Sequence, residues 1–272
     1  MKRVKNKNYL LTWIEKQQSW GRYTFSLDQV KQEFSEISEA GILLALSRLS
    51  KKARIISIYK GFYLIVPPEY SAKGILPPVQ FIDDLMNFIG KPYYVGLLSA
   101  AALHGAAHQQ PQEYFVVTST KQISTQKKGI KINYFTKKKI VDNILDKMKT
   151  QTGYVKVSTP ELTAADLVYY HNRVGGINRV CTVINELSEA INPEKITSDL
   201  IETLSVTTIQ RLGFVFERIV KQPELAQKLY RLTSDQKIKF FMQPLKAGGK
   251  RTGFEKDEKW KIIINADIEI DE

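Results

Sequence analysis

Hydrophobic positions in residues 1–66 follow a helical period first and the pattern of strands afterwards. Over residues 8–18, either Tyr9 and Trp13 or Leu10 and Ile14 share one helical face. A polar and glycine-containing stretch follows, so this segment predicts a first helix that supplies one side of a small core.

Two further helices are indicated by their capping residues. Ser26 and Gln29 form a capping-box pattern, so a second helix is expected to begin there, with Val30 facing inward. A third helix is expected from Ser38 to about Lys52, with an acidic residue in its first turn, where the helix dipole favours it. The inward positions predicted for this third helix are Ile42, Leu43, Leu46 and Leu49.

After the third helix the pattern changes to strands. Residues 55–59 and 62–66 are β-branched and aromatic runs joined by Lys60 and Gly61, which predicts a hairpin with a tight turn. Gly and Pro in residues 70–78 then predict an exposed linker. The domains expected from this reading are a first domain at 1–70, a linker at 71–78 and a second domain at 79–272.

The second domain is expected to mix helices and strands. Helices are predicted at 79–89, 97–105, 141–149, 160–171, 177–190 and 198–220, and strands at 113–118, 131–135, 154–157 and 261–265.

In the first domain, three helices followed by a hairpin within about 60 residues is the order of a winged helix-turn-helix. The predicted fold class is therefore α/β (α+β), with an N-terminal winged helix-turn-helix and a larger mixed α/β C-terminal domain.

The net charge of +12 is confined to the first half of the chain. Residues 1–80 hold 13 Lys/Arg and 6 Asp/Glu, residues 81–139 hold 8 and 3, and residues 140–272 hold 19 of each. This asymmetry indicates a half that faces a polyanion and a neutral half. The alternative, lysines placed for solubility, explains a mild excess of charge but not its confinement to one end.

The exposed face predicted for the third helix, which also carries Leu44, is basic. Arg48 is suited to donate two hydrogen bonds to a guanine edge, and Ser47 to reach a base or a phosphate. The phosphate contacts predicted are Lys51, Lys52, Arg54 and, at the hairpin tip, Lys60 with Tyr59 beside it. The alternative is a solvated helix face whose lysines complement the helix dipole. Because winged helices also bind proteins, the fold alone does not predict DNA binding; the prediction depends on the positive charge of the third helix and the hairpin.

A second basic stretch has no acidic residue between Glu113 and Asp142. Three of its lysines are expected to extend the DNA footprint by phosphate contacts, namely Lys127, Lys128 and Lys131. The alternative is a flexible Lys-rich loop around Gly129.

Several segments carry a resemblance to a known family. The central one is YYVGLLSAAALHG at residues 93–105, which runs into Gln109-Gln110-Pro111 and the strand at 114–118. The others are Leu46-Ser47-Arg48-Leu49, Arg54-Ile55, Gly61-Phe62-Tyr63 ahead of Pro67-Pro68, and residues 158–168 and 210–214. In these segments the chain resembles the AbiEi family, antitoxins of type IV toxin–antitoxin systems associated with abortive phage infection. Members of that family pair a winged-helix head with an α/β antitoxin domain.

The resemblance implies both a regulatory and an antitoxin role. It implies an autorepressor that binds inverted repeats in the double-stranded DNA of its own promoter. It also implies a neighbouring AbiEii-type nucleotidyltransferase toxin, which is countered without a stable complex between antitoxin and toxin. The shared motifs are mostly small residues and glycines at packing positions. They therefore indicate a relationship to the family but do not identify catalytic or binding residues.

Candidate catalytic and metal-binding residues are sparse. His104 and His108 have the spacing that places two imidazoles on one helical face, but a third ligand is missing. No catalytic residue, metal site or cofactor is therefore predicted, and the chain is not expected to be an enzyme. The alternative is a nuclease-like second domain with Glu113, Asp166 and Glu217 as magnesium ligands.

The expected location is the cytoplasm. Cys181 is the single cysteine, so the chain has no internal disulfide, which fits a reducing compartment. The longest apolar runs fall short of the roughly 20 residues needed to span a bilayer, so no membrane partner is expected.

Overall fold

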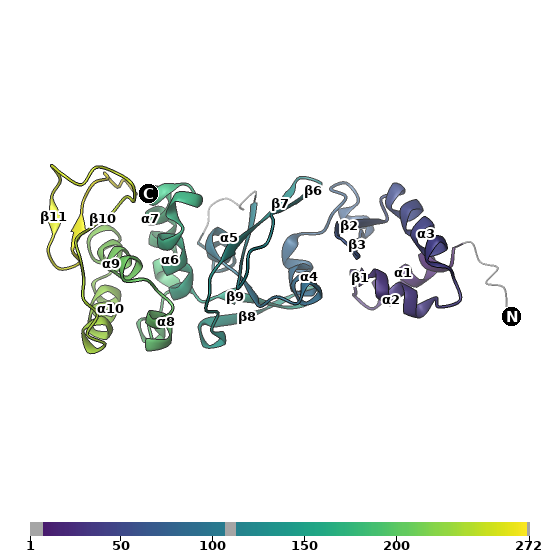
Figure 1. The fold of residues 1–272 in the computed structure, drawn as a ribbon, viewed down its shortest axis with the longest axis horizontal. Helices are drawn as coiled ribbons and strands as arrows, with labels where there is room; N and C mark the ends of the chain where they lie inside the picture. The colour runs from purple at the N-terminus through teal and green to yellow at the C-terminus, as the bar shows by residue number, and fades with distance from the viewer. Residues whose placement is uncertain (1–7, 107–112, 271–272) are drawn as a thin grey trace. The chain divides into compact units, whose positions relative to one another are not determined.

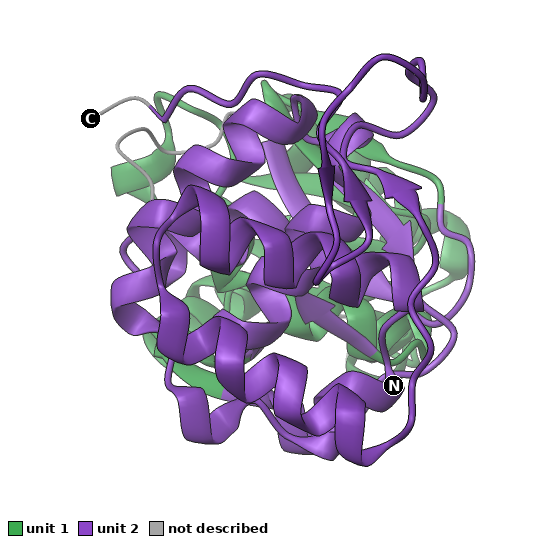
Figure 2. Ribbon diagram, turned by 90° about the vertical axis from the view of Figure 1, so that its left-hand side faces the viewer, with its two compact units in different colours: residues 1–92, 123–132, 147–155 green, residues 93–122, 133–146, 156–272 purple. Residues whose placement is uncertain are grey.

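The computed structural model describes residues 8–106 and 113–270, and its contacts divide the chain into two compact units (Figures 1 and 2). Unit 1 comprises residues 1–92, 123–132 and 147–155. Unit 2 comprises residues 93–122, 133–146 and 156–272. The two hairpin ends at 123–132 and 147–155 therefore belong to unit 1, although their strands continue into unit 2.

Unit 1 begins with a head of three helices and three strands, residues 9–66. The helices are α1 (Tyr9–Ser19), α2 (Leu27–Glu33) and α3 (Glu39–Lys51). The strands are β1 (Thr24–Ser26), β2 (Ile55–Tyr59) and β3 (Phe62–Ile65), which form an antiparallel sheet in the order β1-β3-β2.

The local signals predicted for the head are confirmed. The Ser26 hydroxyl accepts from the Gln29 amide at 3.1 Å, and the Gln29 side chain accepts from the Ser26 amide at 2.8 Å, which completes the capping box. Ser38 caps α3 by accepting from the amide of Gly41. Gly61 has a φ of +76° in the β2–β3 turn, a conformation that favours glycine.

The core of the head lies between the helices and the sheet. In α1 the buried residues are Leu10 and Ile14, which decides between the two faces that the sequence left open. In α3 the prediction for Leu43 is wrong, because its side chain is 43% exposed while Ile42 takes the inward position. The buried core residues of the head are Leu10, Ile14, Phe25, Val30, Ile42, Leu46, Leu49, Ile55 and Ile65.

The residues that follow the head pack within the same unit. The 3-10 turns η1 (Pro68–Tyr70) and η2 (Pro78–Gln80) lead into α4 (Ile82–Ile89). The Thr24 hydroxyl of the head donates to the Asp84 carboxylate of α4 at 2.6 Å. The Gln80 side-chain amide donates to the Tyr70 hydroxyl and to the Gln151 side chain. The segment expected as a linker at 71–78 thus lies inside unit 1.

A six-stranded sheet in the order β6-β7-β5-β4-β9-β8 forms the centre of the remaining chain (Figure 1). Its strands are β4 (Tyr93–Val95), β5 (Glu113–Thr118), β6 (Thr125–Lys127), β7 (Ile130–Thr136), β8 (Leu145–Thr150) and β9 (Gly153–Ser158). β4 pairs antiparallel with β5 and parallel with β9.

Helices and a small sheet complete unit 2. The α-helices are α5 (Leu97–Leu103), α6 (Pro160–Tyr169), α7 (Gly176–Leu187), α8 (Ser198–Glu202), α9 (Val206–Phe214) and α10 (Pro223–Asp235). A π-helical segment, η7 (Val215–Ile219), extends α9, and short 3-10 turns are η3 (Asp142–Ile144), η4 (His171–Arg173), η5 (Ser188–Ala190) and η6 (Pro193–Lys195). A second sheet has the order β10-β12-β11, from β10 (Gln243–Pro244), β11 (Lys256–Asp257) and β12 (Ile262–Ile263).

Helix α6 is buried along nearly its whole length and forms the centre of the unit 2 core. All residues from Pro160 to Val168 are buried, including the polar Glu161, Thr163 and Asp166. Packing around α6 is close because its sequence alternates large residues with alanines and a threonine. Polar groups on this helix therefore require partners within the protein.

The structure corrects three sequence-based predictions in the chain after residue 140. Residues 145–150 form strand β8 rather than a helix, because Lys147 and Lys149 are exposed with Met148 partly buried between them, a period of two. The helix predicted at 198–220 is broken, since Ser205 caps a new helix by accepting from the Thr208 amide. The prediction also omitted α10, whose apolar positions are few.

Candidate functional site

The exposed face of α3 combines cations with two leucines. Ser47, Arg48 and Lys51 are exposed, as the sequence predicted. Leu43 and Leu44 lie on the same side of the helix, one turn before them, with 43% and 53% of their surface exposed. This face presents hydrogen-bond donors, positive charge and apolar groups together to solvent.

The segment that follows α3 is also basic. Lys52 is exposed and is the C-cap residue of α3. Arg54 is partly exposed, and its guanidinium lies 3.6 Å from the Glu15 carboxylate of α1. A surface ion pair at this distance is weak, so it positions the guanidinium without neutralising it.

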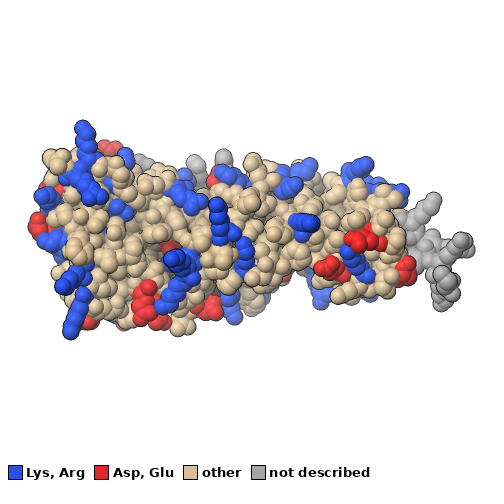
Figure 3. Space-filling model, viewed as in Figure 1, with Lys and Arg blue, Asp and Glu red and all other residues tan. Residues whose placement is uncertain are grey.

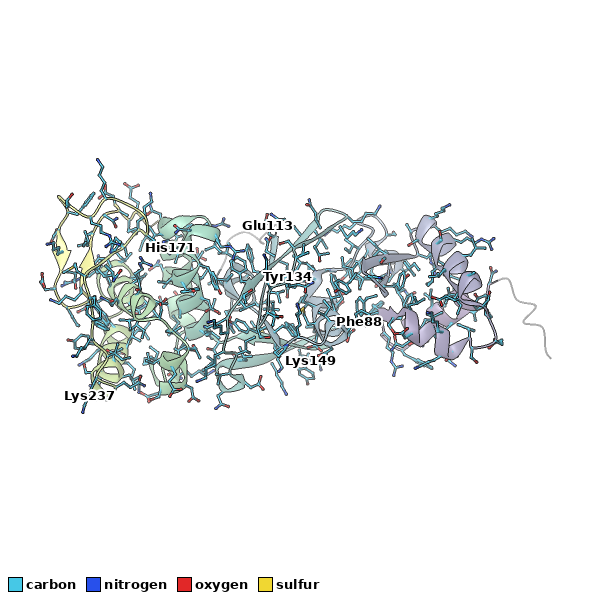
Figure 4. All side chains as sticks on the ribbon, in the orientation of Figure 1. Phe88, Glu113, Tyr134, Lys149, His171 and Lys237 are labelled. Atoms are coloured by element: carbon cyan, nitrogen blue, oxygen red, sulfur yellow. The ribbon has the colours of Figure 1, made fainter. Side chains whose placement is uncertain are left out.

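The β2–β3 turn presents one lysine and an anchored tyrosine. Lys60 is exposed in the turn. The ring of Tyr59 lies edge-on to that of Phe88 on α4, with 6.3 Å between ring centroids (Phe88 is labelled in Figure 4). Tyr59 packs its ring against Phe88 and keeps 37% of its surface exposed.

The lysines of the β6–β7 hairpin belong to the same unit as α3. β6 and β7 pair antiparallel, with Lys127 opposite Ile130 and Gln126 opposite Lys131. Lys128 and Gly129 form the turn, with φ values of +46° and +80°. Lys127 and Lys128 are exposed, and Lys131 is partly buried. A paired hairpin replaces the flexible loop that the sequence left as an alternative.

The two units differ in net charge more clearly than the two halves of the sequence do. By residue number, unit 1 holds 19 Lys/Arg and 8 Asp/Glu, whereas unit 2 holds 21 and 20. Unit 1 therefore carries +11 of the net charge of +12. Figure 3 shows Lys and Arg side chains gathered along the edge of unit 1 where Figure 1 labels α3 and β6. The excess of positive charge, counted over the sequence, therefore belongs almost wholly to unit 1.

The candidate metal ligands are not brought together. The His104 ring Nε2 lies 2.7 Å from the Ser158 carbonyl oxygen, and His108 lies outside the described residues. The Glu113 carboxylate accepts from the side chain of Asn133, whereas Glu217 accepts from Lys259 and from the Trp260 indole. Within the part of the chain that the structure describes, no three His, Cys, Asp or Glu side chains form a group able to hold a metal ion.

Asp166 is the most buried of the three proposed carboxylates. Its Oδ1 accepts from the Lys137 ammonium at 2.8 Å, and its Oδ2 accepts from the Tyr94 hydroxyl at 2.6 Å. Burial, and then the charge of Asp166, raises the pKa of Tyr94 well above its ordinary value, so Tyr94 remains a donor. Burial followed by Asp166 likewise raises the pKa of Tyr170.

A cavity of about 440 Å³ opens above this cluster in unit 2. Its walls come from β7 and the residues after it, α6, and the α8–α9 junction. The residues that line it are Thr136, Lys137, Lys138, Lys139, Asp166, Tyr169, Tyr170, Glu202, Thr203, Leu204, Ser205 and Thr208. Sequence reasoning noted the lysine run and Asp166 separately, but no local pattern showed that the fold joins them.

Comparison with known proteins matches the central part of the chain to a family. Residues 94–218 match the family model of the AbiEi antitoxin C-terminal domain. The fold is similar to the crystal structure of the RV2827C protein from Mycobacterium tuberculosis, with a TM-score of 0.67, 10% sequence identity, and coverage of 93% of this chain and 89% of that one. No curated protein sequence matches this chain.

The matched segment spans the strands and helices from β4 to α9 and includes every residue that lines the unit 2 cavity. Among the described residues, no helix combines the length and the apolar character needed to cross a membrane. The match also agrees with the segment at 93–105 on which the sequence resemblance rests. Residues 94–218 of this chain are thus similar to the C-terminal domain of the AbiEi antitoxins.

Proposed function

We propose that this chain is a DNA-binding autorepressor that acts as the antitoxin of a type IV toxin–antitoxin system. The match at residues 94–218 supports the antitoxin role. The observation that carries the repressor role is the placement of +11 of the net charge on unit 1, whose α3 presents a basic, exposed face.

The head has the order of helices and strands of a winged helix-turn-helix, with α3 as its recognition helix. In the major groove, Arg48 donates two hydrogen bonds to the O6 and N7 atoms of a guanine. Ser47, one residue earlier, reaches a base edge or a phosphate. Leu43 and Leu44 lie towards the N-terminal end of the helix, where their apolar side chains contact the 5-methyl groups of thymines.

The surrounding lysines position the head on the duplex through the phosphates. Lys51 and Lys52 lie at the end of α3, and Lys60 lies at the tip of the wing. Lys127 and Lys128 extend the footprint from the β6–β7 hairpin of the same unit, with Lys131 and Arg54 as further cations. Each phosphate that is neutralised releases counterions, so affinity falls steeply with salt.

The proposed operator is an inverted repeat in the promoter of the chain's own gene, occupied by two protomers in the cytoplasm. The proposed toxin is an AbiEii-type nucleotidyltransferase encoded next to it, and its effect is countered without a stable complex. In this proposal unit 2 acts without catalysis, and its buried Asp166 accepts hydrogen bonds from Lys137 and Tyr94.

The test is gel shift and footprinting on the upstream region of the gene, with a promoter–reporter fusion in cells. We expect the native chain to protect an inverted repeat and to repress the reporter. Arg48→Ala should lose both, whereas Lys156→Ala, an exposed lysine of unit 2 paired with Asp142, should keep both. Equal protection by the Arg48 variant would remove α3 from the interface.

A further inference from the structure

The cavity in unit 2 has a buried ion pair in its lining. The side chains of Lys137 and Asp166 are 13% and 1% exposed, and their charged atoms lie 2.8 Å apart. A buried ion pair adds little to stability, since desolvation offsets much of its attraction. Two tyrosines whose pKa values are raised by burial and by Asp166 adjoin this pair, and groups with perturbed pKa values cluster at functional sites.

The cations at this cavity are not all neutralised. Lys137 is paired with Asp166, and Lys139 lies 3.0 Å from the Glu202 carboxylate on the surface. Lys138, between them, is exposed and takes part in no ion pair with a described residue. With three lysines and two carboxylates in the lining, the cavity keeps one positive charge for a ligand.

The opposite wall adds polar groups that suit a phosphate. Ser205 lies at the N-terminal end of α9, where the helix dipole favours negative charge. Its hydroxyl and that of Thr208 are 2.8 Å apart, and both line the cavity with Thr203. These hydroxyls face the same space as Lys138.

The remaining lining suits a flat apolar ring. Tyr169 is 55% exposed, and its ring stands edge-on to that of Tyr170 at 4.6 Å between centroids, which fixes its orientation. Leu204 lines the cavity as well. A volume of about 440 Å³ falls in the range of small-molecule sites and exceeds the needs of a lone inorganic ion.

We propose that this cavity binds a nucleoside phosphate, with the phosphate between Lys138 and the first turn of α9 and the base against the ring of Tyr169. The site lies wholly within the segment that matches the AbiEi antitoxin domain. It makes that domain responsive to a nucleotide independently of the DNA surface on unit 1. Stacking of the base on the aromatic ring and a charged hydrogen bond to the phosphate both contribute to binding.

The test is calorimetric titration of the full chain at physiological salt with AMP, CMP, GMP and UMP in turn, and with inorganic phosphate and the matching nucleosides. We expect at least one monophosphate to bind about 10-fold or more tightly than phosphate or its nucleoside, since each half of the ligand contributes. Lys138→Ala and Tyr169→Ala should each weaken that binding about 5-fold or more. Both side chains are exposed, so an unchanged thermal midpoint will show that these variants fold.

Two control variants separate this site from other basic surfaces. Lys156→Ala, elsewhere on unit 2, and Lys51→Ala, on α3, should bind the nucleotide as the native chain does. The proposal is overturned if no monophosphate binds better than inorganic phosphate, if the Lys138 and Tyr169 variants bind unchanged, or if Lys51→Ala abolishes binding. Loss of DNA affinity in Lys51→Ala with intact nucleotide binding keeps the two proposals distinct.

Discussion

The ring of Phe88 on α4 contacts the ring of Phe62 on β3, with 5.2 Å between their centroids. Phe62 is buried in the hairpin whose tip carries Lys60. The hairpin is therefore anchored to α4, a helix that follows the linker predicted at 71–78. The head is held through Phe88 and through the Thr24–Asp84 hydrogen bond, so tests of DNA binding require the full chain.

Removal of the Phe88 ring should loosen the hairpin. Phe88 is 39% exposed, so Phe88→Ala is expected to lower the free energy of unfolding by about 1–2 kcal/mol, less than for a fully buried ring. DNA affinity should fall with it, because the turn that carries Lys60 loses its support. Urea unfolding and fluorescence anisotropy measure the two effects. Tyr154→Ala, an exposed tyrosine of unit 1, is the control and should change neither.

The exposed leucines of α3 should read thymine methyl groups. Replacement of single thymines by deoxyuridine in the footprinted operator removes only the 5-methyl group, and at one or two positions it should weaken binding by about 3- to 10-fold. In Leu44→Ala or Leu43→Ala the same replacement should have little further effect, because the contact is already lost. If the deoxyuridine replacement weakens binding of the leucine variant as much as that of the native chain, the leucines do not contact the thymine methyl groups.

The β6–β7 hairpin should set part of the salt dependence. A Lys127→Ala, Lys128→Ala double variant is expected to reduce the slope of log affinity against log salt by about 2, one unit for each phosphate contact. Discrimination between operator and random duplex should stay nearly unchanged, because phosphate contacts carry no sequence information. An unaltered slope would exclude this hairpin from the footprint.

Gly213 has no room for a side chain. A methyl group placed there would lie 2.1 Å from the buried ring of Trp260, which packs against α9. Gly213→Ala is therefore expected to lower the free energy of unfolding by about 1–3 kcal/mol, despite the better helix propensity of alanine. Chemical denaturation of the variant measures this loss. Thr207→Ala, in the first turn of the same helix, should stay within about 0.5 kcal/mol of the native chain.

His171 should make the chain sensitive to acid. Burial holds the pKa of this imidazole below its ordinary value of 6.5, and its Nε2 has no hydrogen-bond partner among the described residues (His171 is labelled in Figure 4). As the pH falls through 6.5, the unfolded chain takes up the proton first, so stability decreases until the pH passes below the lowered pKa of the folded state.

The free energy of unfolding should thus fall by up to about 1.4 kcal/mol per pH unit within that window. His171→Asn retains a donor for the Val168 carbonyl but does not titrate, so its stability should vary less between pH 7.5 and 5. Urea unfolding at both pH values compares the two chains. A native chain that loses no more stability than the variant would show that His171 is not the responsible group.

Local signals in the sequence predicted the head well. The Ser26–Gln29 capping box, the Ser38 cap and the turn at Gly61 each depend on residues within a few positions of one another. Leu43 was misplaced because two leucines in succession satisfy the helical period equally well. Only packing against the head core shows that Leu43 turns outward, whereas Ile42, Leu46 and Leu49 lie inward as predicted.

The unit 2 cavity depends on contacts that the sequence does not reveal. Asp166 meets Tyr94 and Lys137, which lie 72 and 29 residues away along the chain. Strand β8 was predicted as part of a helix because the apolar pattern of residues 141–149 also fits a short helix. In the structure, pairing within the sheet decides in favour of the strand. Long-range pairing, rather than local propensity, therefore places both this strand and the polar cluster.

The most direct test of the central claim is the salt dependence of binding by the full chain to its own upstream duplex and to a shuffled duplex, with the native chain and Arg48→Ala compared. We expect tighter, salt-sensitive binding of the upstream duplex, with the preference reduced by about 1–3 kcal/mol in the variant and the salt slope reduced by no more than about 1. Binding that shows no salt dependence, or a preference that Arg48→Ala leaves intact, would contradict it.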